Sequence, residues 1–164
     1  MNPSKGCALI AVDVVRARGH RNVRALHRTT LEITRDDYLT PRGDCILGVS
    51  ADKAAAHLSR EVREVLRRPL SVLVLVLESG GVRDVVLAQG SERLSLSDER
   101  RIVVRRSSYV AGDTIGVRAN KAAVDIDRRL VERLRRGEEL VAYVIALDIG
   151  EVLRRAGYEA PSEG

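Results

Sequence analysis

Aromatic side chains are almost missing from this sequence, which contains neither Phe nor Trp and only four Tyr. Modules that bind single-stranded nucleic acid by stacking its bases need aromatic rings as platforms, so this scarcity argues against such modules. Apolar residues nevertheless make up 45% of the chain. The sequence therefore predicts a hydrophobic core that is built from Val, Leu, Ile and Ala.

Cysteine is also rare, because the chain has only Cys7 and Cys45, which lie far apart and form no CxxC motif. This spacing excludes a zinc knuckle, and the low number fits a reducing compartment. The sequence shows no signal peptide and no apolar run long enough to cross a membrane. We expect a cytoplasmic protein without a membrane partner, and the sequence assigns neither a metal site nor a cofactor.

Lysine is scarce although the chain is strongly basic. Among its 28 basic residues only Lys5, Lys53 and Lys121 are lysines, and the formal net charge is +5. A basic surface predicts an anionic partner, such as nucleic acid or a phosphate-containing ligand. The same composition is typical of a GC-rich genome or of a heat-adapted surface of ion pairs, so both interpretations stay open.

One stretch of the sequence occurs twice. Residues 43–55, GDCILGVSADKAA, return as residues 112–123, GDTIGVRANKAA, with nine identical positions and one residue dropped. This alignment matches Asp44 with Asp113 and Cys45 with Thr114. A match of this length within one chain indicates an internal duplication.

The similarity extends in both directions from this stretch. Asp13 returns as Asp84 at an offset of 71, and Leu66 returns as Leu134 at an offset of 68. A copy of about 70 residues rarely buries enough apolar surface alone, so we expect the copies to share one core. The predicted organisation is a single domain over residues 1–164, with repeats at roughly 7–78 and 79–147 and a C-terminal tail at 148–164.

Each copy is predicted to contain three strands, a helix and a final strand. Ser59 and Asp127 have the side chains that N-cap positions favour, and a helix is expected after each. The apolar runs Val72–Leu77 and Val141–Leu147 lack alternation, which is typical of strands covered on both faces. The predicted fold is α+β, with two tandem β-β-β-α-β repeats forming one pseudo-twofold, barrel-like β core with two outer helices.

Four motifs together resemble one known family. They are Arg18-Gly19-His20-x-Asn22-Val23, His27-x-Thr29-Thr30-Leu31-Glu32-Ile33-Thr34, Leu39-Thr40-x-x-Gly43-Asp44-Cys45-Ile46 and Ala119-Asn120-Lys121-Ala122-Ala123. Over most of its length the chain is similar to the archaeal domain-of-unknown-function family 371. This resemblance implies an archaeal source and a cytosolic protein, and it brings no assigned activity and no catalytic residues.

Positions that differ between the copies are better functional candidates than positions that both copies share. His20, His27, Thr30 and Glu32 match Ser91, Asp98, Arg101 and Val103. His20, His27 and Glu32 form a candidate set for a general base or a divalent-metal site, and Thr30 and Asp44 complete the candidate catalytic residues. Asp44 and Asp113 each follow Gly, so both are also expected to cap their own turns. Strand parity predicts that His27 and Glu32 point to opposite faces unless a bulge intervenes, and a break near His27 is expected.

The two shared lysines, Lys53 and Lys121, each follow a short strand and precede a helix. Positive charge and free amides at such a position favour an anion, so we expect anion binding at both lysines, supported by Arg28 and Arg42. The alternative is that each lysine packs its stem across the interface between the copies and bonds carbonyl groups with its head.

Three functions therefore follow from the sequence. The first is binding of an anionic ligand, either a phosphate-containing small molecule or nucleic acid. The second is a metal-assisted or His-dependent hydrolase that acts on a small molecule, and the third is a non-catalytic interaction subunit. Whether the protein is an enzyme is left open by the sequence.

Overall fold

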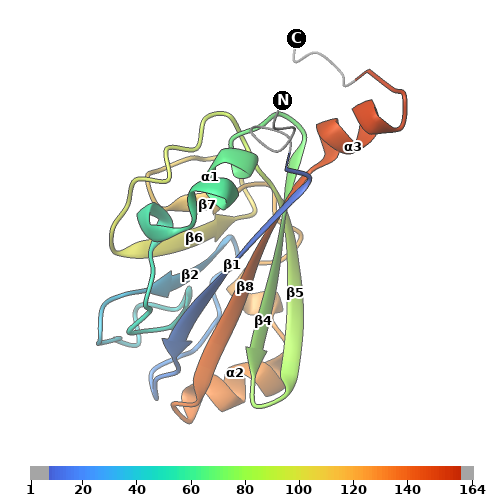
Figure 1. Ribbon diagram of the computed structural model, residues 1–164. Helices are drawn as coiled ribbons and strands as arrows, with labels where there is room; N and C mark the ends of the chain where they lie inside the picture. Colours follow the sequence, from blue (N-terminus) through green and yellow to red (C-terminus); the bar gives the residue numbers. More distant parts are fainter. Residues whose placement is uncertain (1–7, 160–164) are drawn as a thin grey trace.

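The computed structural model describes residues 8–159 and confirms a mixed α+β fold. Its eight strands are β1 (Ile10–Arg18), β2 (Thr30–Thr34), β3 (Ile46–Gly48), β4 (Ser71–Ser79), β5 (Val82–Gln89), β6 (Arg101–Arg105), β7 (Thr114–Gly116) and β8 (Glu139–Asp148). Its helices are α1 (Arg60–Leu66), α2 (Arg128–Arg135) and α3 (Ile149–Arg155), with short 3₁₀ turns η1 (Ala55–His57) and η2 (Ala123–Asp125). Figure 1 shows the arrangement, in which α3 projects from the end of the molecule where the chain leaves β8.

The order β-β-β-α-β occurs twice along the chain, as the sequence predicted. Two predicted strands are shorter than expected, because residues 23–29 and 94–100 form loops in place of strand. The backbone of Ala25 and of Leu96 is left-handed, with φ of 50° at both, which a strand does not allow. The break expected near His27 is therefore confirmed, and β2 begins only at Thr30.

The strands form two separate four-stranded sheets. Sheet A has the order β1-β8-β4-β5 and is antiparallel throughout, while sheet B has the order β3-β2-β6-β7 with an antiparallel central pair and parallel outer pairs. The prediction of a barrel-like core is wrong, because within residues 8–159 only the isolated bridges Arg18–Val49 and Gln89–Val117 join the two sheets. The outer strands β3 and β7 have three residues each, which is too short to continue the ladder into sheet A.

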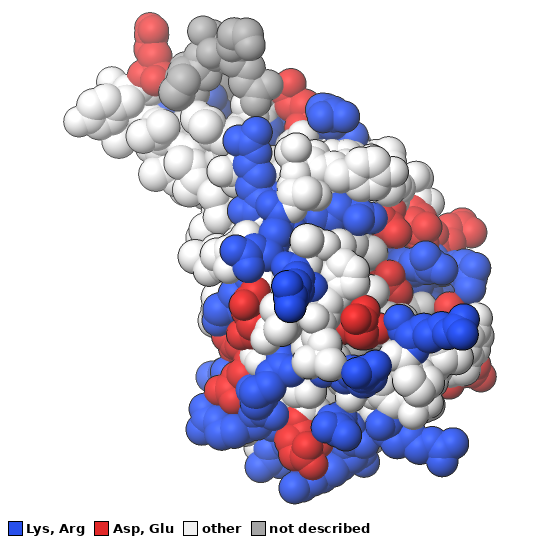
Figure 2. All heavy atoms as spheres, turned by 180° about the vertical axis from the view of Figure 1, so that it is seen from behind, with Lys and Arg blue, Asp and Glu red and all other residues white. Residues whose placement is uncertain are grey.

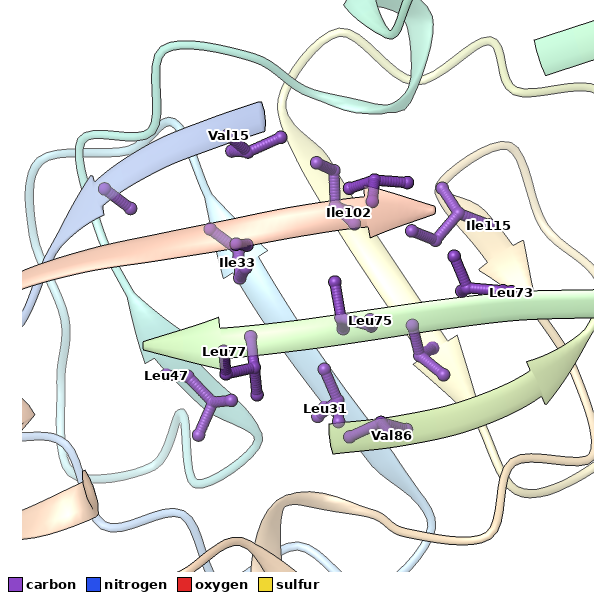
Figure 3. Close-up of a cluster of buried hydrophobic side chains, with 14 of the residues drawn as sticks. Val15, Leu31, Ile33, Leu47, Leu73, Leu75, Leu77, Val86, Ile102 and Ile115 are labelled. Atoms are coloured by element: carbon purple, nitrogen blue, oxygen red, sulfur yellow. The ribbon is translucent and has the colours of Figure 1, made fainter. Parts of the chain in front are cut away.

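The hydrophobic core lies between the inner faces of the two sheets. Figure 3 shows leucine, isoleucine and valine side chains from both sheets packed against one another, including Leu31 and Ile33 of β2 and Leu73 and Leu75 of β4. Helices α1 and α2 add Val62, Val65, Leu66, Leu130, Val131 and Leu134 to the same cluster. The core is aliphatic, as the composition predicted.

Two glycines lie at close contacts between the copies. A Cβ on Gly48 would lie 2.9 Å from Leu140, and a Cβ on Gly116 would lie 2.8 Å from Leu73. Real Cβ atoms do not approach other carbon atoms this closely, so a larger residue at either position would force the leucine side chain to move. In each case the leucine comes from the last strand of the other copy, which joins the copies into one core.

Both predicted helix caps are confirmed. The Ser59 side chain accepts a hydrogen bond from the Val62 amide, and the Asp127 side chain accepts one from the Arg129 amide. The expected number of helices is wrong, because α3 forms within the segment that was predicted as a tail. Within residues 8–159, no helix combines the length and apolar character that crossing a bilayer requires.

The prediction that β4 and β8 are covered on both faces is also wrong. Their inward residues are buried, but their outward residues are only half-buried, in strict alternation along each strand. Most of the outward residues are apolar like the inward ones, so the sequence of each strand shows no alternation between apolar and polar residues. The inner face packs on the core, whereas no described helix or strand packs on the outer face of sheet A (Figure 1).

Candidate functional site

Two loops of the first copy are hydrogen-bonded to each other beside sheet B. The amides of Leu26 and His27 both donate to the Asp44 carbonyl, at 2.9 and 3.2 Å. The Asn22 side chain donates to the Leu39 carbonyl at 2.7 Å. Segment 22–29 therefore lies along segment 39–45, and groups that are separated in sequence come together.

The pairing of these loops gathers three exposed arginines, Arg24, Arg28 and Arg42, which we call the arginine rim. Arg24 makes a long contact of 3.5 Å with the Pro41 carbonyl. Within residues 8–159 none of the three forms an ion pair. Three guanidinium groups that lack acidic partners are free to bind an external anion.

Many other exposed arginines, although not all of them, form ion pairs within residues 8–159. Figure 2, seen from behind, shows that basic side chains gather at the end of the molecule where α2 lies, with acidic side chains between them. On and beside α2, Arg129 pairs with Asp127, and Arg136 pairs with Glu132. The alternative of an ion-paired surface therefore describes much of the molecule, but it does not describe the arginine rim.

The corresponding loop of the second copy has the opposite charge. Residues 19–29 contain three arginines and no acidic residue, whereas residues 90–100 contain two arginines and three acidic residues, so the formal charges are +3 and −1. Arg24 and Arg28 correspond to Ser95 and Glu99. The rim is therefore a property of the first copy alone.

Glu32 lies beside these loops on the outer face of sheet B. Leu31 and Ile33 point into the core, so Glu32 points to the other face, where it is opposite Val103 of β6. Its exposed fraction is only 9%, yet its carboxyl group makes no hydrogen bond or ion pair within residues 8–159. A largely buried carboxyl group without a partner is costly when ionised.

Burial raises the pKa of Glu32 to about 7, with the nearby charges of Asp113 and Asp36 acting in the same direction and Arg101 and Arg105 opposing it. Its proton is therefore exchangeable near neutral pH. This is the range in which a carboxyl group can act as a general acid or base.

Cys45 lies next to this carboxyl group, since the Glu32 amide donates to the Cys45 carbonyl at 2.8 Å. Burial and the charge of Glu32 raise the pKa of the Cys45 thiol to about 11, while a hydrogen bond with the Thr30 side chain lowers it. The thiol is protonated at neutral pH. Cys45 is therefore not an activated nucleophile, in agreement with the sequence-based interpretation.

Ion pairs surround Glu32 on this face. Arg105 pairs with Asp113 at 3.1 Å, with side chains that are only 17% and 13% exposed. Arg100 donates to both carboxylate oxygens of Asp36 at 3.0 Å. Arg105, one of the two arginines whose charge acts on Glu32, is thus already engaged with another carboxylate.

The three histidines share one structural role. In each, Nδ1 accepts hydrogen bonds from nearby backbone amides: His20 from Asn22 at 3.0 Å, His27 from Thr29 and Thr30, and His57 from Ala54 at 3.0 Å. An amide can donate only to a ring nitrogen without a proton, so each Nδ1 is unprotonated. Each histidine therefore stabilises a turn by accepting hydrogen bonds from its backbone amides.

The second copy makes the same hydrogen bonds with oxygen acceptors. Ser91 accepts from the Arg93 amide, Asp98 accepts from the Arg100 and Arg101 amides, and Asp125 accepts from the Ala122 amide. These three acceptors occupy the positions of His20, His27 and His57. The difference between the copies, which suggested catalysis by histidine, has a structural explanation at all three positions.

This role leads to a test at His27. We expect His27→Ala to lower the free energy of unfolding by about 1 kcal/mol, because two turn amides lose their acceptor, whereas His27→Asp should keep the wild-type stability. Urea unfolding at pH 7 measures both. Equal loss of stability in the two variants would contradict the role of a turn acceptor.

Both lysines have carboxylate partners from the chain itself. Lys53 donates to Asp13 at 2.5 Å and to the Val14 carbonyl at 2.9 Å, and Lys121 pairs with Asp84 at 2.5 Å. These partners take the place that was predicted for an external anion. A signal for them was present in the sequence, because an acidic and a basic residue were repeated together.

The candidate residues are only partly brought together. His27 contacts Thr30, with its Nδ1 2.9 Å from the Thr30 hydroxyl, and Thr30 and Glu32 lie on the same face of β2. The parity argument placed His27 and Glu32 on opposite faces, but it does not apply, because His27 precedes the strand. Within residues 8–159 the His20 side chain bonds the Asn22 amide and makes no hydrogen bond with this group.

Asp44 and its predicted counterpart also need correction. Asp44 contributes its backbone carbonyl to the loop pairing, and within residues 8–159 its carboxylate caps no turn. In the second copy Gly112 accepts the equivalent bonds, from the Ser97 and Asp98 amides. Asp44 therefore corresponds to Gly112, and the gap between the copies lies earlier than the sequence alignment placed it.

The same shift pairs Cys45 with Asp113 and Ile46 with Thr114. Glu32 donates to the Cys45 carbonyl, and Val103 donates in the same way to the Asp113 carbonyl. The sequence alignment had paired Asp113 with Asp44 as a shared turn residue, so Asp113 was not among the candidate site residues. Tyr38 and Tyr109, which follow β2 and β6, lie at the surface and are 61% and 63% exposed.

A metal site has no geometric support within residues 8–159, where no three His, Cys, Asp or Glu side chains are grouped so that they could hold an ion. The groups that remain for chemistry are the arginine rim and the Glu32 carboxyl.

Comparison with known proteins identifies similar sequences. The model of a family described as "Domain of unknown function (DUF371)" matches residues 15–147. The "Uncharacterized protein MJ0206" of Methanocaldococcus jannaschii is 42% identical over 132 residues, which cover 80% of this chain and 97% of that protein. These matches confirm the resemblance that the four motifs indicated, and the matched region contains both the arginine rim and Glu32.

Proposed function

The chain belongs to the family described as a domain of unknown function, DUF371, and we propose that it binds an anionic ligand carrying phosphate groups at the arginine rim. The observation that carries this proposal is the pairing of two loops that presents Arg24, Arg28 and Arg42 without acidic partners within residues 8–159. Guanidinium groups form the strong, often bidentate hydrogen bonds that phosphate oxygens accept.

Contacts from the second copy hold the rim in place. Arg128 of α2 donates to the Ala25 carbonyl at 3.0 Å, and the Val124 amide of η2 donates to the His27 carbonyl at 3.0 Å. These bonds fix the loop between Arg24 and Arg28. A loop that is ordered before binding loses less entropy when the ligand arrives.

The proposal assumes that the two copies descend from one ancestral unit and are related by a pseudo-twofold axis, so that their corresponding positions can be compared. The second copy has the same turns, with Ser95 and Glu99 in place of Arg24 and Arg28. The fold therefore does not need arginine at these positions. A ligand explains their presence in the first copy.

A second basic region is a weaker candidate for the same ligand. It is a groove of about 320 Å³ whose lining includes Arg68, Arg93 and Arg118. Arg68 is already paired with Asp148 at 2.9 Å, and Glu92 also lines the groove. Its charge is partly neutralised, so an anion should prefer the arginine rim.

Matched double variants test this assignment. Arg24→Ala/Arg28→Ala removes charge from the rim, and Arg93→Ala/Arg118→Ala removes the same charge from the groove. With inorganic pyrophosphate, ATP and a short single-stranded RNA as probes, titration calorimetry should show at least about tenfold weaker binding for the rim variant and little change for the groove variant.

Three results would contradict the proposal: no binding of any probe to the wild-type protein, equal weakening in the two variants, or a larger effect in the groove variant. The probes also distinguish the possible sources of the phosphate. Affinity for RNA should fall steeply with added salt, because several phosphates are neutralised at once, whereas a small phosphate ligand should show a weaker dependence.

One observation favours an enzyme as the second candidate function. Glu32 has a pKa of about 7 and lies beside Thr30 and Cys45, next to the loops that form the rim. A buried carboxyl group that exchanges its proton near neutral pH is suited to general acid or base catalysis on a bound ligand. This candidate replaces the His-dependent version, because the histidines serve as turn acceptors.

A further inference from the structure

The outer face of sheet A is apolar across all four strands. On β4 and β8 the outward residues that are apolar are Val72, Val74, Val76, Val141, Tyr143, Ile145 and Leu147. The edge strands add Val12, Val14, Val85 and Leu87, of which Val12 is 54% and Leu87 45% exposed. In Figure 1, sheet B lies on the opposite side of sheet A.

We propose that this outer face of sheet A packs against the same face of a second copy of the chain, forming a homodimer. The strand registers make the face continuous, because Tyr143 is paired with both Val14 and Val76, and Ile145 with both Val12 and Val74. Rows of apolar side chains therefore cross the sheet from one strand to the next.

The size of the face fits a stable dimer. Four strands about 4.8 Å apart, with outward residues over about seven positions, define a surface roughly 20 Å by 25 Å. The accessible surface of a ridged face exceeds its flat projection, and with its polar margin it approaches the ~800 Å² that each partner buries in a standard interface. An apolar patch of this extent is among the largest that monomeric proteins expose, and such patches are often functional.

The charges of the face favour a second copy over a partner of opposite charge. At the end where β8 begins, Arg16 pairs with Glu139 at 2.9 Å, and Arg83 pairs with Glu78 at 2.6 Å. These ion pairs neutralise most of the charge at this end of the face, where Arg18 has no ion pair within residues 8–159, and the centre of the face is uncharged. Two copies related by a twofold axis meet without repulsion, and such isologous contacts between sheets pack at about 10 Å.

Hydrogen bonds at both edges of sheet A hinder the addition of a further strand there. The surface of sheet A that stays open is therefore its outer face. On the free side of β1, the Asp52 carboxylate accepts from the Arg16 amide, and the Asp52 amide donates to the Arg16 carbonyl, at 2.9 Å each. Asn120 makes the same two bonds with Leu87 on the free side of β5. Both edge strands have backbone groups that are already satisfied by these side chains and amides.

Sedimentation velocity with matched variants tests the dimer. The wild-type protein at 100 µM should sediment with twice the mass of the chain, and Tyr143→Glu at the centre of the face should sediment as a monomer. Tyr38→Glu introduces the same charge at an exposed tyrosine outside sheet A and should remain a dimer.

Leu87→Glu, at the exposed edge of the face, provides a second variant in case Tyr143→Glu does not fold, and circular dichroism checks the fold of each. A monomeric wild-type protein would overturn the proposal. So would a dimer that persists in the folded face variants, or one that Tyr38→Glu dissociates equally.

Discussion

Asp13→Asn is expected to lower the free energy of unfolding by about 3 kcal/mol at pH 7, because it breaks a largely buried ion pair and its supporting hydrogen bonds. The Asp13 carboxylate accepts bonds from Lys53 at 2.5 Å, the Val14 amide at 2.8 Å and the Ser59 amide at 2.8 Å, and its side chain is 13% exposed. Asparagine has no charge to balance Lys53. Urea unfolding measures the loss.

The pH dependence of this effect provides its own check. Burial would raise the pKa of Asp13, but the bonds from Lys53, Ser59 and Val14 lower it below its usual 3.8. A lowered pKa in the folded state adds stability above the unfolded pKa, and this stability is lost as the pH falls through the folded value. The difference between wild type and Asp13→Asn should therefore shrink below about pH 4.

Two controls accompany this prediction. Asp84→Asn should behave like Asp13→Asn, since Asp84 pairs with Lys121 and accepts from the Val85 and Asp127 amides. Asp37→Asn, at an exposed aspartate, should change stability by less than about 0.5 kcal/mol. If Asp13→Asn is no more harmful than Asp37→Asn, the ion pair does not stabilise the fold.

Glu32→Gln is expected to do the opposite and stabilise the protein at pH 8, by up to roughly 3 kcal/mol. Burial raises the pKa of Glu32 from 4.5 to about 7, so the folded state binds a proton more tightly than the unfolded chain. Stability should therefore fall as the pH rises from about 4.5 to 7, and it should stay level above this range. Glutamine has the shape of the protonated carboxyl group and avoids this cost.

Thermal or urea unfolding of both proteins between pH 4 and pH 8 tests this expectation. The stabilities should converge near pH 4.5, where Glu32 is protonated in the folded protein. Glu92→Gln, at an exposed glutamate, serves as a control and should show no such pH dependence. A loss of stability at pH 8 in Glu32→Gln would show that the carboxylate has a favourable partner.

The loss of stability that an ionised Glu32 is expected to cause bears on function. The second copy has Val103 at the corresponding position, directly opposite Glu32 in the sheet, so the fold accepts an apolar residue there. A carboxyl group that lowers stability beside unpaired arginines is consistent with a site that acts on a ligand. The Glu32→Gln variant should then bind a phosphate probe while it loses any catalytic activity.

Local features of the fold were determined by the sequence. The caps at Ser59 and Asp127 depend on side chains that bond amides within three residues, and so they could be read from the chain alone. The order of strands and helices followed from repeated apolar patterns. The aliphatic composition of the core followed from the absence of Phe and Trp.

The tertiary structure alone decided which distant groups meet. His27 accepts hydrogen bonds from turn amides, and Asp98 makes the same bonds in the other copy. This equivalence is visible only from the positions of the backbone amides. The alignment of Cys45 with Asp113 likewise depends on hydrogen bonds between strands. Local preferences do not specify such bonds, because partners far apart in sequence are chosen by packing of the whole core.

The contrast is clearest in β4 and β8. Their sequences determined that both faces of each strand would be apolar, and the fold decided that only one face would meet the core. Alternation between faces is a property of the strand itself, whereas burial depends on what packs against each face. The residues along each strand determine the chemistry of its two faces, and the three-dimensional arrangement decides which face the core covers.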